Sequence, residues 1–368
     1  MHILVTGSDG FVGKNLVLKL REQESIEVST FTRSNSLEDL KGIIPHIDYV
    51  VHLAGSNRPE QDQDFVTDNL DLTKNICDLL VNTGKDIPII FSSSIHSDAD
   101  TPYGLSKRGA EECLISYSEK TNNSIYIYKI PNIFGKWSRP NYNSVVATFC
   151  HNIANDISID INDKNKELSL VYIDDVIDDF LQILLGKKQP EYPEIKPIYK
   201  ITIDLLAKTL YSFNDIRNTN IVDKVGDGFT RALYATYISY LNPENFKYKL
   251  DGHIDDRGVF CEFLKTSNSG QFSFFTAYPG ITRGGHYHHT KNEKFLVISG
   301  SAQFRFRNLY NDEKYILDVD SDNFEVVETI PGWVHDITNT GKKELIVLLW
   351  ANEIFDQNKP DTFWSRVE

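Results

Sequence analysis

Three glycines near the start of the chain constrain its fold more than any other feature. They stand at every third position from residue 7 to residue 13, after the apolar run of residues 3–6 and before a stretch with helical spacing. Glycines in this strand–loop–helix context let the backbone approach a pyrophosphate, whose charge then lies at the N-terminus of the helix. The loop therefore predicts a dinucleotide site, whose expected contacts are Gly7, Gly10, Phe11, Val12 and Gly13.

The first 243 residues alternate between short apolar runs and longer stretches with helical spacing. The expected strands are residues 3–6, 28–32, 49–53, 87–92 and 124–130. Helical spacing is clearest at residues 69–81 and 103–119. Such alternation predicts a parallel sheet with helices on both faces, which is a Rossmann-type α/β domain over residues 1–243.

The pattern changes after about Tyr240. Short apolar runs are then separated by Gly, Pro, Asn and Asp, and the clearest runs are residues 270–277, 295–298, 302–306, 324–327 and 345–350. Without a long helical pattern, residues 250–368 are expected to form an all-β barrel or sandwich. The expected join lies near residues 242–244.

Composition restricts the partners of the chain. The net charge of −14 disfavours a nucleic-acid partner, because such a surface repels a phosphate backbone. No apolar run approaches membrane-spanning length, and the first residues lack a basic region with a cleavage site, so we expect a cytoplasmic protein without a membrane partner. The four scattered cysteines suit reduced thiols.

The end of the second expected strand bears on the choice of dinucleotide. An acidic residue there would bind the ribose 2′-hydroxyl of NAD, but the chain has Thr32, Arg33 and Ser34. An arginine can pair with a 2′-phosphate, so Arg33 favours NADPH as the cofactor. The alternative is an exposed arginine at the end of a strand.

Tyr103 and Lys107 form a YxxxK pair at the start of a helical stretch. Residues four apart share a helical face, so the ammonium can lie near the phenol. A lysine and a cationic nicotinamide are expected to lower the pKa of the tyrosine from about 10, which makes Tyr103 an acid or base. Ser94, at the end of an expected strand, could polarise a carbonyl beside it. The alternative is a solvated helix face and a polar turn.

A second set of residues indicates a metal site. Gly280, His286, His288, Glu293 and Gly300 fall in the spacing G-x5-H-x-H-x4-E-x6-G. Histidines at i and i+2 on a strand point to the same side of a sheet. With His335 they form a set of three histidines and one carboxylate, which suits one divalent transition metal. The alternative is a histidine-rich surface loop.

These motifs occur together in known families. The glycine loop, Ser94 and the YxxxK pair follow the order of the short-chain dehydrogenase/reductase superfamily, and roughly the first 240 residues resemble its extended branch, the nucleotide-sugar enzymes. The resemblance implies that Ser94, Tyr103 and Lys107 are catalytic. It also implies cofactor contacts at Leu53, Ala54, Gly55, Tyr103 and Lys107 in addition to the loop and Arg33.

Two further details refine this resemblance. Ile95 and His96 stand where dehydratases of this branch carry an acidic pair, so we expect simple reduction and no dehydration. The histidine spacing resembles the first cupin motif, whereas the second motif has Ile330 where a proline is usual.

Over essentially its whole length the chain resembles the bifunctional CapF-type enzymes of capsule and O-antigen biosynthesis. The segments that carry this resemblance include residues 134–137, 140–145, 288–295 and 358–362. It implies that a zinc-binding cupin domain epimerises C3 of a UDP-2-acetamido-2,6-dideoxy-4-ketohexose. The reductase domain would then reduce C4 with NADPH, giving a UDP-N-acetyl-6-deoxy-L-talosamine-type product on the route to UDP-N-acetyl-L-fucosamine. A homodimer is also expected from the family.

The residues leave two alternative functions open. The cupin domain could be a non-catalytic sugar-binding or assembly module, which would leave a 4-keto-sugar reductase only. The N-terminal domain could instead be a cofactor-sensing regulator, although a sensor has no need of an acid–base pair. The base that removes the C3 proton is also open, and the candidates are a metal-bound water, Lys294 and Tyr287.

Overall fold

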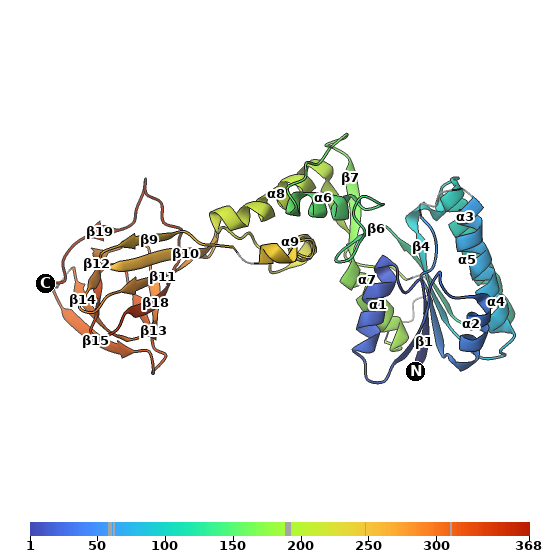
Figure 1. Cartoon of the computed structure of the whole chain (residues 1–368), viewed down its shortest axis with the longest axis horizontal. Helices are drawn as coiled ribbons and strands as arrows, with labels where there is room; N and C mark the ends of the chain where they lie inside the picture. The colour runs from blue at the N-terminus through green and yellow to red at the C-terminus, as the bar shows by residue number, and fades with distance from the viewer. Residues whose placement is uncertain (58–60, 62, 188–192, 247, 310) are drawn as a thin grey trace. The chain divides into compact units, whose positions relative to one another are not determined.

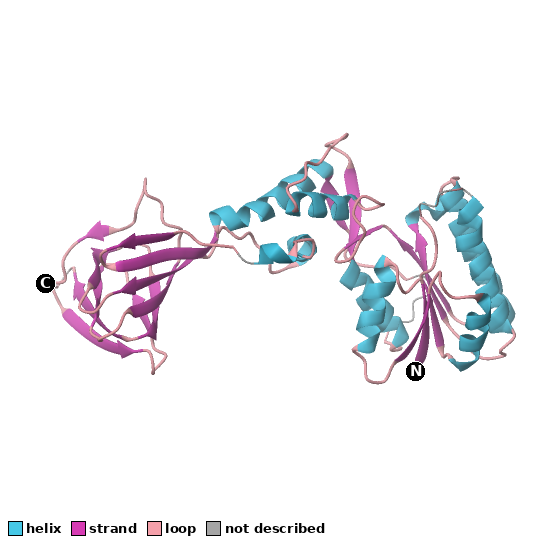
Figure 2. Ribbon diagram, in the orientation of Figure 1, coloured by secondary structure: helices cyan, strands magenta, loops and turns pink. Residues whose placement is uncertain are grey.

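The structure is a computed structural model that describes residues 1–57, 61, 63–187, 193–246, 248–309 and 311–368. The chain divides into two compact units. The first comprises residues 1–210 and 231–241, and the second comprises residues 211–230 and 242–368. The first unit mixes helices and strands, whereas the second consists mostly of strands (Figures 1 and 2). Within the described residues, no helix is long and apolar enough to cross a membrane.

The first unit is built on a sheet of five parallel strands in the order β2-β1-β3-β4-β5. The strands are β1 (His2–Thr6), β2 (Glu27–Phe31), β3 (Tyr49–His52), β4 (Ile89–Ser94) and β5 (Ile125–Ile130). The connecting segments are α1 (Phe11–Arg21), α2 (Leu37–Ile43), η1 (Ile44–His46), α3 (Gln63–Phe65), the π-helix η2 (Val66–Asp71), α4 (Leu72–Val81), η3 (Ile95–Asp98) and α5 (Pro102–Thr121).

Helices cover both faces of this sheet. Helices α1 and α7 (Ile173–Leu184) lie on one side, and α4 and α5 lie on the other (Figure 1). Because both faces are covered, the central strands are apolar along almost their whole length, and every residue of β3 is buried. The predicted Rossmann-type fold is therefore confirmed.

A small sheet follows that the sequence pattern did not predict. It has the order β6-β7-β8, with β6 (Asn132–Phe134), β7 (Glu167–Tyr172) and β8 (Tyr199–Thr202). The remaining helices of this region are α6 (Val145–Ala154), α8 (Ile203–Thr219) and α9 (Gly228–Ile238). Strand β6 is only three residues long, so its alternation is too brief to recognise in the sequence.

The second unit contains two antiparallel sheets in the orders β16-β13-β18-β11-β10-β9 and β15-β14-β17-β12-β19. The first sheet consists of β9 (Gly252–Asp255), β10 (Gly258–Thr266), β11 (Gly270–Ala277), β13 (Glu293–Ser299), β16 (Val326–Thr329) and β18 (Leu345–Ala351). The second consists of β12 (Thr282–Tyr287), β14 (Ser301–Asn308), β15 (Lys314–Asp320), β17 (Trp333–Asn339) and β19 (Phe363–Trp364), and the short helix η4 (Pro243–Phe246) lies before β9.

Alternating apolar side chains from the two sheets form the core of this unit. In β14, for example, Ala302, Phe304 and Phe306 are buried while the residues between them are more exposed. Phe295 packs edge-on against Phe304, which joins the first sheet to the second. This period of two places every second residue inside. The all-β prediction for the C-terminal part is confirmed.

Candidate functional site

The glycine loop joins β1 to α1, and a side chain would not fit at Gly7 or Gly13. A Cβ atom at Gly13 would lie 2.2 Å from the carbonyl oxygen of Gly7, and one at Gly7 would lie 2.7 Å from the amide nitrogen of Ala54. Gly7 also has a φ angle of +66°, which favours glycine. Gly10 is the N-cap of α1, and no side chain caps this end among the described residues. Phe11 and Val12 form the first turn of the helix.

The end of β3 is held against this loop by a chain of hydrogen bonds. The hydroxyl of Thr73 donates to the carbonyl oxygen of Asn69, so it accepts a hydrogen bond from Nε2 of His52. The other ring nitrogen of His52 then accepts from the hydroxyl of Thr6, at 2.7 Å. The hydroxyl of Thr6 in turn accepts from the amides of Leu53 and Ala54, each at 3.2 Å. The predicted cofactor contacts Leu53, Ala54 and Gly55 thus lie beside the glycine loop.

Arg33 lies two residues beyond β2 with its side chain exposed. Its guanidinium forms an ion pair with Asp68 of the π-helix η2, at 3.1 Å. The arginine is therefore available to a phosphate at the end of β2, although Asp68 partly balances its charge. This position fits the predicted contact to a 2′-phosphate.

Ser94 and Tyr103 meet at the carboxyl end of β4. Ser94 is the last residue of β4, and Tyr103 lies in the first turn of α5. The short helix η3 takes up four of the eight residues between them. Burial raises the pKa of Tyr103, and its hydrogen bond with Ser94 acts in the opposite direction. That Lys107 and a cationic nicotinamide together lower this pKa stays a prediction, because in the protein without cofactor burial of the phenol sets the direction.

Lys107 is buried one helical turn after Tyr103 on α5. Its ammonium donates to the carbonyl oxygen of Ser92 at 3.0 Å and lies 4.9 Å from the centre of the Phe91 ring. Burial lowers the pKa of Lys107 to about 8, and the negative charge of Glu111 opposes this shift. A Cβ atom on Gly55 would lie 3.4 Å from the ammonium, so the lysine also adjoins the end of β3.

Two buried residues support this arrangement and were missed as functional residues in the sequence. Asn69 donates to Ser106 of α5 at 2.9 Å and exchanges two hydrogen bonds with the backbone of Ser56. Glu111, one helical turn after Lys107, accepts a hydrogen bond from Ser93 of β4. The spacing YxxxKxxxE could have pointed to Glu111, because positions i and i+4 share a helical face and so place it beside Lys107.

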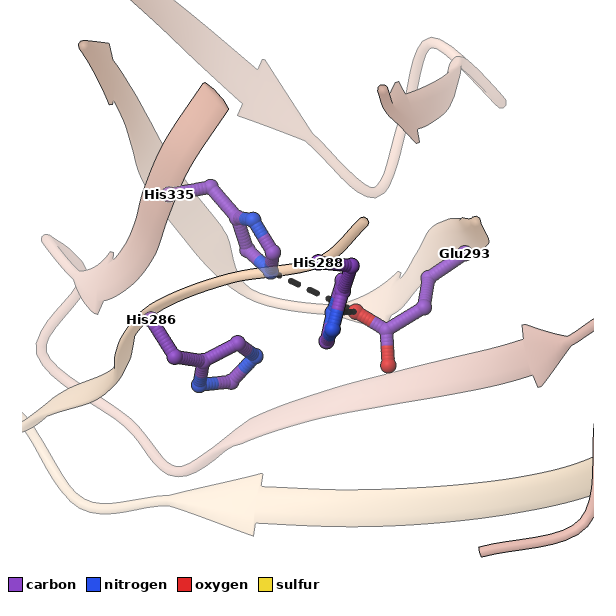
Figure 3. Close-up of side chains that lie close together, drawn as sticks. All are labelled: His286, His288, Glu293 and His335. Carbon is purple, nitrogen blue, oxygen red and sulfur yellow. Dashed lines mark hydrogen bonds and ion pairs between the residues drawn. The ribbon is translucent and has the colours of Figure 1, made fainter. Parts of the chain in front are cut away.

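The predicted metal ligands come together in the second unit. His286 ends β12 with Tyr287, His288 follows, Glu293 begins β13, and His335 lies on β17. Their candidate donor atoms all lie within 4.8 Å of one another (Figure 3). The Nε2 atoms of His288 and His335 lie 3.2 and 3.3 Å from one carboxylate oxygen of Glu293.

The protonation state of this cluster fits a metal. Burial and then the neighbouring His335 lower the pKa of His286 to about 3, so its ring is neutral. Burial acts to raise the pKa of Glu293, but the histidines and Lys291 hold it well below its usual range. Neutral imidazoles and a carboxylate are the forms that bind a divalent transition metal.

The geometry also fits. Among the described residues, Nδ1 of His286 and both ring nitrogens of His335 are buried without a hydrogen-bond partner. Zinc bonds are about 2.1 Å long, so donors on opposite sides of one ion lie at most about 4.2 Å apart. A small closure of the side chains would bring all four donors onto one ion.

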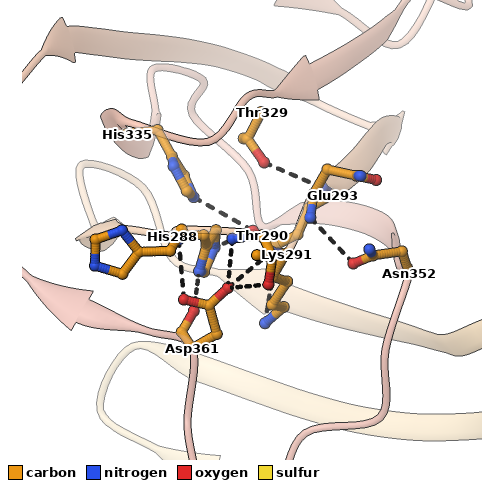
Figure 4. Close-up of polar contacts among 10 residues, drawn as sticks. His288, Thr290, Lys291, Glu293, Thr329, His335, Asn352 and Asp361 are labelled. Carbon is orange, nitrogen blue, oxygen red and sulfur yellow. Dashed lines mark hydrogen bonds and ion pairs between the residues drawn. The ribbon is translucent and has the colours of Figure 1, made fainter.

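Lys291 is a further residue of this cluster that the sequence did not single out. Its ammonium lies 3.1 Å from the second carboxylate oxygen of Glu293, and the side chain is buried (Figure 4). Asp361 lies next to it and binds the turn that contains it. Lys291 lies within the motif of residues 288–295. The direction of its side chain depends on a turn, and hydrophobic periodicity does not predict the shape of a turn.

The structure removes one of the three candidate bases. Lys294 follows Glu293 on β13 and points to the opposite face, where it is exposed and pairs with Glu328. It therefore does not face the histidine cluster. Tyr287, between His286 and His288 in the sequence, stacks on Phe363.

Comparisons with known proteins agree with both units. Residues 3–196 match the NAD dependent epimerase/dehydratase family, and residues 253–363 match the polysaccharide biosynthesis C-terminal domain. A UDP-2-acetamido-2,6-beta-L-arabino-hexul-4-ose reductase of Pseudomonas aeruginosa is 50% identical over 364 residues, which are 99% of this chain and 98% of that protein. The crystal structure of capsular polysaccharide assembling protein CapF from Staphylococcus aureus has a TM-score of 0.94, with 41% identity and 100% of both chains covered. The chain belongs to the CapF family.

The first unit of this CapF-family chain also shares its fold with more distant proteins. UDP-glucuronic acid 4-epimerase from Bacillus cereus, solved in complex with NAD, has a TM-score of 0.56 and 19% identity, covering 65% of this chain and 98% of that one. This likeness shows the fold alone. The CapF-type chain thus combines a nicotinamide-dependent fold with a histidine cluster that fits a metal.

Proposed function

We propose that the chain reduces the 4-keto group of a UDP-2-acetamido-2,6-dideoxy-4-ketohexose with NADPH, after its cupin unit has epimerised C3. The relative that is 50% identical over nearly the whole chain and bears a reductase name supports this substrate class. The observation that carries the proposal is the meeting of Ser94, Tyr103 and Lys107 at the carboxyl end of β4, beside the glycine loop.

The reductase residues suit proton donation to a ketone. NADPH supplies the hydride that reaches C4. The phenol of Tyr103 donates its proton to the C4 oxygen, and its raised pKa keeps that proton available near neutral pH. Ser94 hydrogen-bonds the same oxygen and orients it. The buried ammonium of Lys107 stabilises the tyrosinate that remains after the transfer.

The loop and the exposed arginine support NADPH as the cofactor. The uncapped N-terminus of α1 and the glycines around it suit the pyrophosphate. Arg33 suits the 2′-phosphate that distinguishes NADPH from NADH.

The histidine cluster supports the epimerase part of the proposal. A proton on C3 is acidic only while C4 is a ketone, so epimerisation must precede reduction. A divalent metal, for which zinc is our choice, supplies Lewis-acid stabilisation of negative charge on the C4 oxygen. His286, His288, Glu293 and His335 would hold it, and Lys291 adds a buried positive charge beside Glu293.

The product expected from these two steps is of the UDP-N-acetyl-6-deoxy-L-talosamine type. Such a product would serve synthesis of UDP-N-acetyl-L-fucosamine for a capsule or an O-antigen. The Pseudomonas relative and the CapF structure support this placement through their names.

NADPH oxidation with the UDP-4-keto sugar tests the reductase. We expect Tyr103→Phe to lower the rate by about 10²- to 10⁴-fold, because the proton donor is lost. Tyr211→Phe is the matched control, since Tyr211 is an exposed tyrosine of α8. If Tyr103→Phe oxidises NADPH at the wild-type rate, the proposed acid is wrong. If the wild type oxidises none with this substrate, the proposed function is wrong.

A further inference from the structure

The last part of the chain lies beside the strand that carries His286 and leads directly to His288. After β18, residues 352–362 lead to β19, which pairs antiparallel with β12. In this register Trp364 lies opposite His286, and Phe363 lies opposite Tyr287. Asp361, two residues before Phe363, is thereby placed next to His288 and the turn that follows it.

The carboxylate of Asp361 binds three consecutive backbone amides of that turn. It accepts from His289 at 2.9 Å, from Thr290 at 2.7 Å and from Lys291 at 2.8 Å (Figure 4). The hydroxyl of Thr290 donates a fourth hydrogen bond at 2.9 Å. Successive amides that converge on one anion form a preorganised concavity. One side chain therefore fixes the turn.

This turn sets the distance between two metal donors. It leads from His288 towards Glu293, whose side chains contribute a nitrogen and an oxygen to the cluster. If the turn opened, the two donors would separate, since residues 289–291 are the greater part of the chain between them. The carboxylate of Asp361 therefore acts on the donor set through the backbone.

The backbone of Asp361 acts on His288 directly. The Nδ1 atom of His288 lies 2.5 Å from the carbonyl oxygen of Asp361. A carbonyl only accepts, so Nδ1 carries the proton and donates. In the neutral ring the lone pair is then on Nε2, the nitrogen that faces the carboxylate of Glu293 at 3.2 Å, so a cation between these two groups would be bound by both. Asp361 thus selects the tautomer that can bind a metal through Nε2.

We propose that Asp361 is a positioning residue of the metal centre, which sets the turn between His288 and Glu293 and the tautomer of His288 without binding the metal itself. This inference rests on the metal site of the proposed function. Both carboxylate oxygens already accept hydrogen bonds from the turn, which separates this role from that of a fifth ligand.

Zinc affinity of the full-length protein tests this role. Zn²⁺ would be titrated against a competing chelator for the wild type, Asp361→Ala and Asp361→Asn. We expect both variants to lose about 10- to 100-fold in zinc affinity, as is typical when a group that orients a ligand is removed. Asp356→Asn is the matched control, because Asp356 lies in the same segment and its carboxylate accepts from the nearby amide of Asn358. The control should bind zinc like the wild type.

Thermal unfolding with and without Zn²⁺ separates positioning from general stabilisation. Ligand binding raises the melting temperature according to affinity, so the gain from zinc should shrink in both Asp361 variants. If Asp361→Ala does not fold, Asp361→Asn still provides the test, because asparagine has nearly the same size as aspartate. Unchanged zinc affinity, or an equal fall in melting temperature with and without zinc, would overturn the inference. A wild type that binds no zinc would overturn the metal site and this inference together.

Discussion

The ammonium of Lys107 donates a hydrogen bond to the backbone carbonyl oxygen of Ser92 at 3.0 Å. This bond ties α5 to β4 two residues before Ser94, while Tyr103 lies one helical turn before the lysine. The three groups therefore have a fixed spacing that does not depend on a flexible connection. The same burial that fixes the lysine also makes its charge sensitive to pH.

We expect the reduction rate to fall as pH rises through about 8, where Lys107 loses its proton. The direction follows because burial lowers the pKa of this lysine, and only its charged form stabilises the tyrosinate. Of the groups that face it, Glu111 is charged and His52 is neutral, since burial lowers the pKa of His52 to about 3. The profile of kcat/KM against pH checks this. A rate that stays level to pH 10 would contradict it.

Glu111→Gln should move this alkaline limb to lower pH. The negative charge of Glu111 favours the charged form of Lys107, and its loss leaves burial unopposed. At pH 8 we expect the rate to fall at least about twofold. Glu112→Gln, on the exposed face of the same helix, is the control. Lys129 also lies 3.8 Å from Glu111, so its charge remains near the site in the variant. A limb at the wild-type pH would show that Glu111 has only a structural role.

Gly13→Ala should weaken NADPH binding at least about tenfold, because the added methyl group would force the carbonyl of Gly7 out of the loop. The same strain should lower the free energy of unfolding by about 1–3 kcal/mol. Gly42→Ala is the matched control, since nothing lies near its Cβ position on α2. It should leave binding unchanged and gain up to about 1 kcal/mol from helix propensity. Wild-type NADPH affinity in Gly13→Ala would contradict the loop assignment.

Arg33→Gln should weaken NADPH binding by about 10- to 100-fold, because a charged hydrogen bond to the 2′-phosphate is lost. NADH binding should change little, since NADH lacks that phosphate. Fluorescence titration with both cofactors measures the ratio. Arg21→Gln, at the exposed end of α1, serves as the control. Equal losses for both cofactors would mean that Arg33 does not select between them.

The sequence predicted the parts of the fold that local patterns determine. The expected run of residues 270–277 coincides with β11, because alternation and bounding turns define such a strand. The helix expected from residue 69 instead begins as the π-helix η2, and α4 starts at Leu72. Periodicity could not show this, since the hydrogen bonds of Asn69 reach Ser56 and Ser106, far away in the sequence.

The candidate sites show the same division. Spacing alone selected His286, His288 and Glu293, and the structure brings them together with His335. Asp361 was missed as a functional residue because its hydrogen bonds join segments about 70 residues apart. Lys294 was a candidate base on its position in the motif, yet strand alternation turns it away from the cluster. The features that the sequence could not predict are therefore those that depend on contacts between distant segments.

Deuterium exchange at C3 of the UDP-4-keto sugar tests the central claim most directly. The substrate would be incubated in heavy water with Tyr103→Phe, whose defective reductase leaves the ketone intact, and followed by NMR. The account predicts that deuterium enters C3 with metal-loaded protein and fails to enter after chelation or in His335→Ala. Absence of C3 exchange under all conditions, while the wild type oxidises NADPH with this substrate, would contradict it and leave a 4-keto reductase with a binding domain.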